Sequence, residues 1–417
     1  MARFEAALAR SGAACGFLDP AHAEAIGEVC KRARFDTAAL ARAARQAGTL
    51  AIPFVKALTD QVSATSPQAA RYVHFGATSQ DVADTASALC LGEASARIAE
   101  LARALGDALA ELARRHGATA MLARTLLQPA APIPFGWKAA MWLSPLARAL
   151  PRFQAAAADA CVLQFGGASG TLSAFGQRGG AVADALAREL GLQRRVTWHS
   201  ARDALARFGA EAAILVGLSA KIGRDIALLM QAEVGELAEP AAGGRGASSS
   251  MPHKRNPALS MLALEAARRA PGLAATLLGE LEGEHERGLG QWQSQWLTLR
   301  ELTGATASAL GAMLEAVREL QVNEAAMRAN IERSRGLVFS EALALRLSRP
   351  VADRLCAQAL REGRHLLEVL RADKEAMRQL GSADAAALFE PRTNYGSAAE
   401  MTERVLSEWA KARGNAP

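Results

Sequence analysis

The sequence is poor in aromatic and β-branched residues. Aromatic residues make up 5% of its 417 residues, whereas half of the chain is hydrophobic and alanine and leucine dominate. Because aromatic and β-branched residues favour strands, while alanine and leucine favour helices, we expect an all-α fold. A chain of this length can bury more than one core, so we also expect several domains.

The sequence also lacks the cysteine and hydrophobic patterns of secreted and membrane proteins. Its five cysteines are odd in number, lie far apart and are never spaced as Cys-x-x-Cys, which predicts a reduced, cytoplasmic protein. No signal peptide and no uncharged apolar run of spanning length occurs, so we expect no membrane partner. The seven histidines form no ligand cluster, and we expect neither a metal nor an organic cofactor.

Dense positive charge is missing as well. The formal net charge is +6 and the isoelectric point is near 9.3, yet the chain has no long block of consecutive Lys or Arg. A nucleic-acid-binding protein usually concentrates its basic residues. We therefore expect no nucleic-acid partner, and we expect a mild preference for anionic small molecules.

A Gly- and Ser-rich stretch between two long apolar-periodic segments is the most distinctive feature that is present. Residues 243–257 read Gly-Gly-Arg-Gly-Ala-Ser-Ser-Ser-Met-Pro-His-Lys-Arg-Asn-Pro. The glycines permit left-handed backbone, the serines supply hydroxyl and N–H donors, and Lys254 and Arg255 add positive charge. Such a loop can fold over an anion. A flexible linker is the alternative, but the ordered ending from Met251 onward argues against it.

Two further motifs precede this stretch. Residues 74–86 begin with His-Phe-Gly-Ala-Thr-Ser-Gln-Asp and open a long segment with apolar residues on one face. Thr78 or Ser79 can cap this helix with Asp81 in its first turn, and a positive helix end can bind a carboxylate. Residues 124–136 contain three prolines within six positions, which excludes a continuous helix and predicts a break between helices.

Long apolar stripes predict the remaining architecture. Helices are expected at about residues 204–237 and after residue 257, as parts of an elongated helical bundle. A Glu-His-Glu-Arg sequence at 284–287 precedes Trp292 and Trp296, whose ordinary role would be to pack in a subunit interface. The expected domains are an N-terminal helical domain at 1–80, a central bundle at 81–332 and a small C-terminal helical domain at 333–417.

These motifs, in this order, resemble the fumarase/aspartase superfamily. The stretch at 243–257 resembles its signature loop, Gly-Ser-Ser-x-Met-Pro-x-Lys-x-Asn, with Ala247 at the leading glycine. Residues 74–86 and 124–136 resemble the first and second signature regions. Residues 284–296 resemble the branch of 3-carboxy-cis,cis-muconate cycloisomerases.

The resemblance covers nearly the whole chain. It implies a three-domain all-α fold and a homotetramer with active sites shared between chains. Members of the superfamily usually carry a further segment ahead of the position of Met1, which leaves open a missing leading segment.

The resemblance also implies roles for individual residues. In the superfamily the signature loop closes over a carboxylate substrate, and the first serine of the pair, here Ser248, exchanges a proton with the carbon next to a carboxylate. The implied catalytic residues are Ser248, Ser249, Lys254 and Asn256. The implied substrate-binding residues are His74, Thr78, Ser79, Thr125, Gln128, His285 and Arg287.

The chain departs from the adenylosuccinate-lyase pattern at two positions. Those lyases are thought to use a histidine of the second region, held by a glutamate seven residues after the loop lysine, and here the two positions are Pro129 and Met261. A carboxylate that leaves or attacks needs no such acid, because its unperturbed pKa is about 4. We therefore favour a cycloisomerase that converts the tricarboxylate 3-carboxy-cis,cis-muconate to carboxymuconolactone in protocatechuate degradation. The alternatives are an adenylosuccinate-lyase-like C–N lyase and a catalytically silent helical scaffold.

Overall fold

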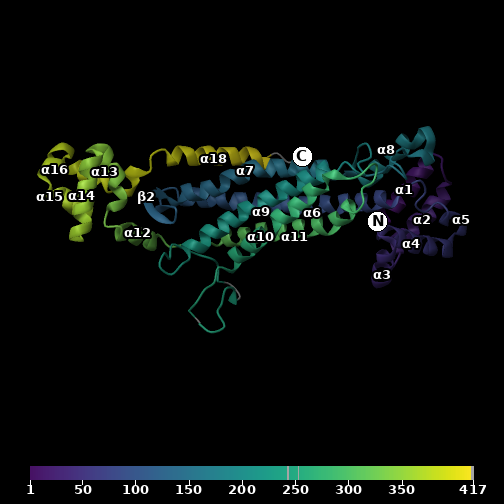
Figure 1. The fold of residues 1–417 in the computed structure, drawn as a ribbon, viewed down its shortest axis with the longest axis horizontal. Coiled ribbons are helices and arrows are strands. Elements are labelled where there is room, and N and C mark those ends of the chain that lie inside the picture. Colours follow the sequence, from purple (N-terminus) through teal and green to yellow (C-terminus); the bar gives the residue numbers. More distant parts are fainter. Residues whose placement is uncertain (242–243, 252, 415–417) are drawn as a thin grey trace. The chain divides into compact units, whose positions relative to one another are not determined.

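The computed structural model describes residues 1–241, 244–251 and 253–414, and it confirms the all-α prediction (Figure 1). The described strands are short and form separate pairs. The longest pair is an antiparallel hairpin of β1 (Ala120–Thr125) and β2 (Gln128–Pro134). The other pairs join β3 (Val162–Leu163) to β4 (Gln193–Arg194) and β5 (Leu237–Ala238) to β6 (Gln321–Val322).

Five long helices carry the apolar stripes that the sequence predicts. In the first of them Ile98, Leu105 and Leu109 recur at helical spacing and are buried. None of the described helices combines the length and the apolar character needed to cross a membrane. The long helices are α6 (Ser79–Arg115), α7 (Phe135–Ala160), α9 (Asp203–Leu229), α10 (Ala258–Gly279) and α11 (Gln291–Arg318).

The structure divides into two compact units, and each long helix contributes residues to both. Unit 1 comprises Met1–Ala99, Arg152–Ala213 and Arg269–Thr306, and unit 2 comprises Glu100–Pro151, Ile214–Arg268 and Ala307–Pro417. The three consecutive domains expected from the sequence stay a prediction.

Unit 1 contains the short helices expected in the N-terminal region. Two of them begin at aspartate caps, because Asp19 and Asp36 accept hydrogen bonds from the backbone N–H groups that follow. Helix α1 packs against α2 and α8 (Figure 1), and Phe4 of α1 is fully buried in a core of the unit. The shorter helices are α1 (Ala2–Ala14), α2 (Pro20–Arg32), α3 (Thr37–Ala47), α4 (Ala51–Thr65), α5 (Pro67–Ala70) and α8 (Gly179–Leu190), with 3₁₀ turns η1 (Ser173–Arg178) and η3 (Glu280–Glu282).

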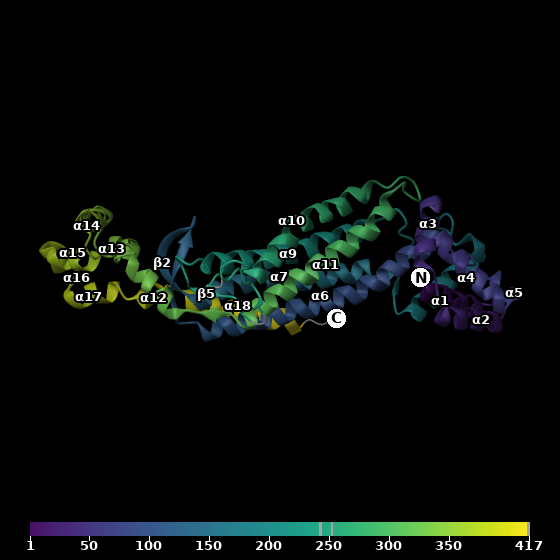
Figure 2. The same cartoon turned by 90° about the horizontal axis from the view of Figure 1, so that it is seen from below.

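Unit 2 contains the C-terminal helices (Figure 2), and those between residues 324 and 388 share a core that includes Leu122 of β1 and Leu355. The last helix returns to α6, where the Trp409 indole N–H donates to the Asp107 carboxylate at 2.9 Å. A Cβ at Gly106 would lie 2.2 Å from the Trp409 ring, so this crossing requires glycine. The helices are α12 (Glu324–Arg333), α13 (Ser340–Arg346), α14 (Arg349–Glu362), α15 (Leu366–Ala372), α16 (Lys374–Leu380), α17 (Ser382–Leu388) and α18 (Ala398–Gly414), with 3₁₀ turns η4 (Leu337–Phe339) and η5 (Pro391–Asn394).

Candidate functional site

The first signature region forms the start of α6 and belongs to unit 1. The backbone N–H of Thr78, immediately before the helix, donates to the Asp81 carboxylate at 3.0 Å. This contact is the half of a capping box in which the third helical residue reaches back to the cap. Ser79 is the first residue of the helix. Thr78 and Ser79 therefore lie at its positive end, where a bound carboxylate is favoured.

Asp81 ties this helix start to the glycine-rich loop that follows β3. Its Oδ1 accepts hydrogen bonds from the Gln164 side-chain amide and the Gly166 N–H, both at 3.0 Å, and its Oδ2 accepts from the Gly167 N–H at 2.9 Å. The His199 Nε2 lies 2.8 Å from Oδ1. Asp81 is fully buried. Because hydrogen bonds to a charged acceptor are stronger than neutral ones, these contacts set the loop against the start of α6.

A second buried network begins at the neighbouring residue, Gln80. Its side-chain Nε2 donates to the His199 carbonyl at 2.8 Å and to the Asp84 carboxylate at 3.1 Å. Asp84 is held in turn by both Nη atoms of Arg202, at 2.6 and 3.0 Å, in an ion pair that is almost completely buried. Because Gln80 Nε2 donates to these two acceptors, Gln80 Oε1 points away from them.

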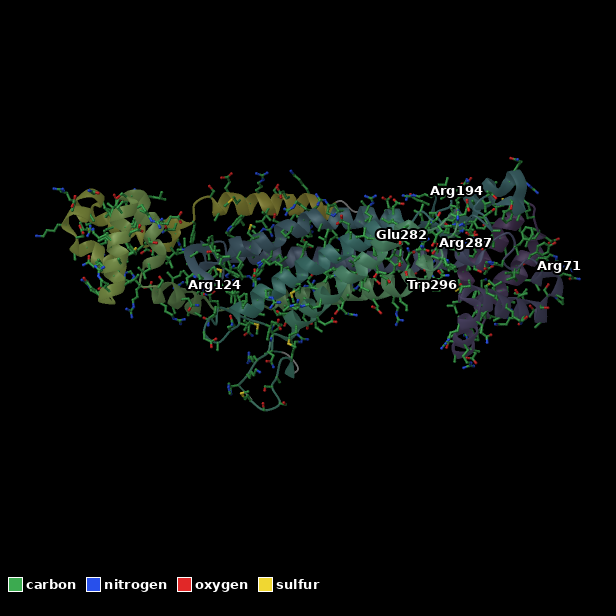
Figure 3. All side chains as sticks on the ribbon, viewed as in Figure 1. Arg71, Arg124, Arg194, Glu282, Arg287 and Trp296 are labelled. Atoms are coloured by element: carbon green, nitrogen blue, oxygen red, sulfur yellow. The ribbon has the colours of Figure 1, made fainter. Side chains whose placement is uncertain are left out.

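Arg287, which is labelled in Figure 3, contacts this oxygen, although it lies 207 positions further along the chain. Its Nε–H donates to Gln80 Oε1 at 3.1 Å, and its Nη2 donates to the Ala168 carbonyl at 3.0 Å. Nη1 has no hydrogen-bond partner among the described residues. A half-buried guanidinium held along one edge, with N–H groups left over, is suited to bind a carboxylate. The structure thus brings Arg287 to the helix start that carries Thr78 and Ser79.

His285 does not join this network. Its side chain is exposed, its backbone has a φ of 48°, and its ring has no hydrogen-bond partner among the described residues. Trp292 and Trp296 contact each other edge to face, with ring centroids 5.1 Å apart. Their packing in a subunit interface stays a prediction.

His74 lies just ahead of α6, in a backbone conformation that is uncommon for a residue other than glycine. Its φ is 61°. Its backbone N–H donates to Glu5 Oε2 at 3.0 Å, and its Nδ1 lies 2.7 Å from Glu5 Oε1. Burial of the ring opposes its charged form, but the hydrogen bond and the charge of Glu5, with a contribution from Asp81, raise the pKa of His74 above its ordinary value.

The second signature region is a β-hairpin in unit 2. The prolines exclude a helix, as predicted, and all three lie in β2, where a two-stranded hairpin accommodates residues without an N–H. Thr125 and Gln128 pair with each other at the tip and are exposed. Between them Leu126 and Leu127 have φ of 52° and 65°, the sign that a type I′ turn requires at both positions. Asn-Gly is the usual signal for this turn, and this sequence lacks it.

An ion pair holds the hairpin next to its tip, because Arg124 immediately precedes the tip residue Thr125. Arg124 donates to both carboxylate oxygens of Glu236, at 2.8 and 2.7 Å, and the Glu236 side chain is fully buried. The Asn330 side-chain amide also donates to Glu236, at 2.7 Å. A buried pair with such additional hydrogen bonds is well satisfied. Thr125 and Gln128 are therefore presented by an anchored hairpin.

The signature loop is tied at its neck. The backbone N–H of Asn256 donates to the Gly246 carbonyl at 2.8 Å, and Ala247 and Arg255 form an isolated β-bridge. Gly246 has a φ of 70°, and a Cβ there would lie 2.3 Å from the Asn256 carbonyl oxygen, so only glycine fits. Arg245 forms an ion pair with Glu315 of α11 at 2.6 Å.

Beyond this neck the loop extends away from the helices of its own unit (Figure 1). Ser248 is half-buried, and its Oγ accepts hydrogen bonds from the backbone N–H groups of Met251 and Ser250 at 3.2 and 3.4 Å. No side chain of the described residues lies against it as a base. The other candidates are Ser249 and Lys254, which are exposed, and Asn256, which is half-buried. Two positions of the predicted loop, Gly243 and Pro252, lie outside the described residues.

Helix α10, which follows the signature loop, is capped by Glu239, a residue that precedes the loop in the sequence. Glu239, which is buried, accepts hydrogen bonds from the backbone N–H groups of Leu259 and Ser260, both at 2.8 Å, and from the Ser260 hydroxyl at 2.6 Å. A carboxylate at this end of α10 satisfies N–H groups that the helix leaves free. The two flanks of the loop are thereby held together.

The predicted residues thus fall into two sets. The set in unit 1 gathers around the start of α6, and the set in unit 2 divides between the hairpin tip and the loop. Glu5, Gln80 and Arg202 were not predicted. The first set is His74, Thr78, Ser79 and Arg287, with His285 nearby in sequence, and the second is Thr125, Gln128, Ser248, Ser249, Lys254 and Asn256.

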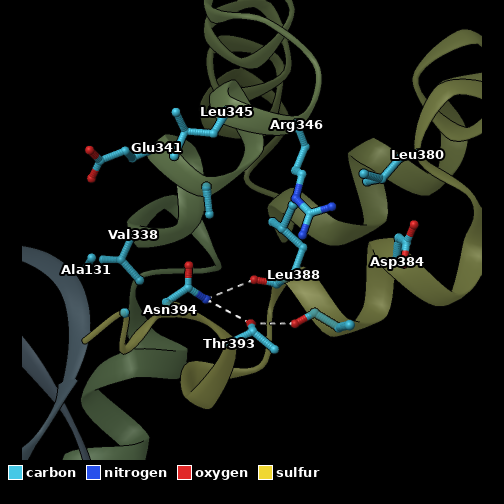
Figure 4. A pocket seen from close by; sticks show the side chains of 13 residues that line it. Ala131, Val338, Glu341, Leu345, Arg346, Leu380, Asp384, Leu388, Thr393 and Asn394 are labelled. Carbon is cyan, nitrogen blue, oxygen red and sulfur yellow. Dashed lines mark hydrogen bonds between the residues drawn. The ribbon is translucent and has the colours of Figure 1, made fainter. Parts of the chain in front are cut away.

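A pocket in the C-terminal helices contains none of these residues (Figure 4). Arg346 points into it, and Glu341 and Asp384 also line it. One cation and two carboxylates do not match a substrate with several negative charges. Within the described residues no group of three or more His, Cys, Asp or Glu side chains could hold a metal ion, and independence of metals stays a prediction.

Comparison with known proteins identifies the family. A family model described as a lyase matches residues 1–272. The chain is 47% identical to a 3-carboxy-cis,cis-muconate cycloisomerase of Bradyrhizobium diazoefficiens, over 97% of this chain and 92% of that protein. The chain belongs to the fumarase/aspartase superfamily.

Two further proteins are similar to this chain over nearly its whole length. The crystal structure of the 3-carboxy-cis,cis-muconate lactonizing enzyme from Pseudomonas putida superposes with a TM-score of 0.92 at 39% identity, over 99% of this chain and 94% of that one. A nitrosuccinate lyase of Streptomyces davaonensis is 39% identical, over 97% of this chain and 89% of that protein. The superfamily fold therefore extends over nearly the whole chain.

Proposed function

We propose that this member of the superfamily is a cycloisomerase that converts 3-carboxy-cis,cis-muconate to carboxymuconolactone. In this reaction one carboxylate oxygen adds to a double bond of the same molecule, and the carbon next to another carboxylate gains a proton. Relatives named as cycloisomerase and lactonizing enzyme support this reading.

The observation that carries the choice within the superfamily is the replacement of the acid pair. Pro129 lies in β2, and Met261 lies on α10 with 57% of its surface exposed. Neither side chain can donate a proton. An attacking carboxylate is already ionised at neutral pH, so the addition does not require a separate acid or base at the oxygen.

In the proposed mechanism Ser248 delivers the proton to carbon. Negative charge develops on the carboxylate next to that carbon, and Lys254, Asn256 and the N–H groups of the loop are the donors that would stabilise it. A serine hydroxyl is a weak acid and a poor base in water, so its reactivity depends on a loop that closes and places cationic groups around it. Arg287 and the start of α6, with Thr78 and Ser79, would bind another carboxylate of the substrate.

We also infer a cytoplasmic homotetramer in which active sites are shared between chains. The inference rests on the resemblance to the superfamily. It agrees with the exposure of Thr125, Gln128 and Lys254, whose side chains are presented outward from their own unit.

The second candidate function is that of a C–N lyase. The 39% identity to a nitrosuccinate lyase favours it, because that relative is also matched over nearly its whole length. An adenylosuccinate-lyase-like activity would require an acid at a position other than Pro129.

A substrate comparison tests the proposal. Purified protein is incubated separately with 3-carboxy-cis,cis-muconate, adenylosuccinate and nitrosuccinate, and the ultraviolet absorbance of each is followed. We expect turnover of the muconate alone, with the lactone identified by NMR. Turnover of adenylosuccinate or nitrosuccinate alone would overturn the proposal in favour of a lyase. Turnover of none by well-folded protein would support a silent scaffold.

A further inference from the structure

Glu5 is a buried carboxylate whose two oxygens both contact one residue. It lies in the first turn of α1, and it is 1% exposed. Oε2 accepts the backbone N–H of His74 at 3.0 Å, and Oε1 lies 2.7 Å from the His74 Nδ1. Removing a carboxylate from water costs free energy unless it is paired and hydrogen-bonded. The contact with His74 supplies both conditions across 69 positions of the chain.

This contact determines how the imidazole is presented. The hydrogen bond to Oε1 places a proton on Nδ1, so Nε2 is the ring nitrogen that is left to contact another group. Nε2 has no hydrogen-bond partner among the described residues, and the ring is 17% exposed. The second contact, to the backbone N–H, holds His74 in its left-handed conformation. One carboxylate therefore fixes the backbone, the ring orientation and the nitrogen that faces outward.

We propose that Glu5 is a positioning residue that holds His74 as an imidazolium, so that its Nε2–H binds a carboxylate of the substrate next to the start of α6. The identity of that anion rests on the proposed function. The ion pair itself does not.

The charges around His74 support this role. The charged groups that face it are Glu5 from α1 and Asp81 from α6, and together they outweigh burial and raise its pKa. The amino group of Met1 and the thiol of Cys30 are the groups near Glu5 on its other sides. A raised pKa means that His74 keeps its charge to higher pH than a free histidine. Substrate binding that depends on this charge is therefore full at low pH and is lost as pH rises through that pKa.

The test substitutes Glu5→Gln, which keeps the shape and one acceptor oxygen but removes the charge. The pKa of His74 is measured by NMR in full-length protein with labelled histidine rings, and kcat and KM for 3-carboxy-cis,cis-muconate are measured against pH. In the parent we expect a His74 pKa above the free value of about 6.5. In the variant we expect it to fall toward the free value, with the alkaline limb of the kcat/KM profile moving to lower pH and KM rising roughly tenfold at a pH between the two measured pKa values.

Two further variants distinguish the positioning role of Glu5 from a general loss of folding. Glu324→Gln is the matched control, because Glu324 lies 3.6 Å from His116 and should alter the titration of His116 alone. In His74→Gln the new side chain can still donate to Glu5, so this variant should fold. It should raise KM and abolish the alkaline limb of the kcat/KM profile. This variant tests the proposal if Glu5→Gln does not fold.

The possible failures are distinguishable. An unchanged His74 pKa in folded Glu5→Gln would overturn the ion pair, and this readout needs no substrate. A shifted pKa with an unmoved kcat/KM profile would overturn the role in binding. A parent protein that shows the raised pKa but does not turn over the muconate would refute the proposed function while leaving the ion pair intact.

Discussion

The first signature region and the signature loop differ in how the fold holds them. At the start of α6, Gln80 and Asp81 are connected by side-chain hydrogen bonds to three other parts of the chain, at Gln164, His199 and Arg287. In the described part of the loop, the hydrogen bonds of the Ser248 side chain run to the backbone two and three residues further on. The first region is already organised to bind an anion. We propose that the second, which carries the predicted proton-transfer serine, acquires its arrangement when it closes.

This difference assigns separate tasks to the two regions. A carboxylate-binding site benefits from rigid donors, because less entropy is lost when the ligand binds. A loop that covers the substrate has to open for entry and release, so its tip cannot be fastened to the core. The fold accordingly fastens the loop at Gly246 and Asn256 and leaves the described residues between them exposed or, at Ser248, half-buried.

The largest effect is expected from removing the reactive hydroxyl of the loop. Ser248→Ala should reduce kcat by at least about a hundredfold, the usual scale for a proton-transfer group. The melting temperature should stay unchanged, because the Ser248 hydrogen bonds among the described residues are local. Steady-state kinetics and thermal unfolding check this. Ser249→Ala is the matched control and should lose less. Equal and mild losses in both variants would contradict the assignment.

Removing the charge at Asp81 should instead reduce the stability of the folded protein. In Asp81→Asn an amide N–H₂ replaces one of two oxygens that both accept buried hydrogen bonds, so we expect a decrease of about 3 kcal/mol in the free energy of unfolding. Urea unfolding measures it. Asp36→Asn, at the exposed cap of α3, is the control and should cost much less. Similar midpoints for the two variants would show that Asp81 does not organise the first region.

The smallest effect is expected from restoring the acid pair. The double substitution Pro129→His with Met261→Glu should leave lactone formation unchanged or slower, because protonating a carboxylate at neutral pH is uphill by about 4 kcal/mol and an acid has little to contribute. Initial rates and thermal stability are compared with the parent, since losing Pro129 also alters the hairpin. A stable variant that is many times faster would mean that this chain is a weakened lyase.

Sequence patterns predicted the parts of the site that are contiguous. The helices follow from apolar periodicity, and the loop and the start of α6 follow from short motifs. The hairpin was predicted only as a break, because Leu126–Leu127 carries none of the Asn or Gly residues that announce a type I′ turn. Glu5 and Arg202 were not predicted as partners of His74 and Asp84, because their partners lie 69 and 118 positions away and nothing in the local sequence specifies those contacts.

Hydrogen exchange of the full-length protein, with and without a tricarboxylate ligand, tests most directly whether one region is preorganised and the other closes. Without ligand, amides in the first turns of α6 should be protected, and amides at 248–251 should exchange at rates near those of an unstructured chain. With ligand, protection should rise strongly in the loop and little in α6. A loop that is already protected without ligand, or one that the ligand leaves unprotected, would contradict the account.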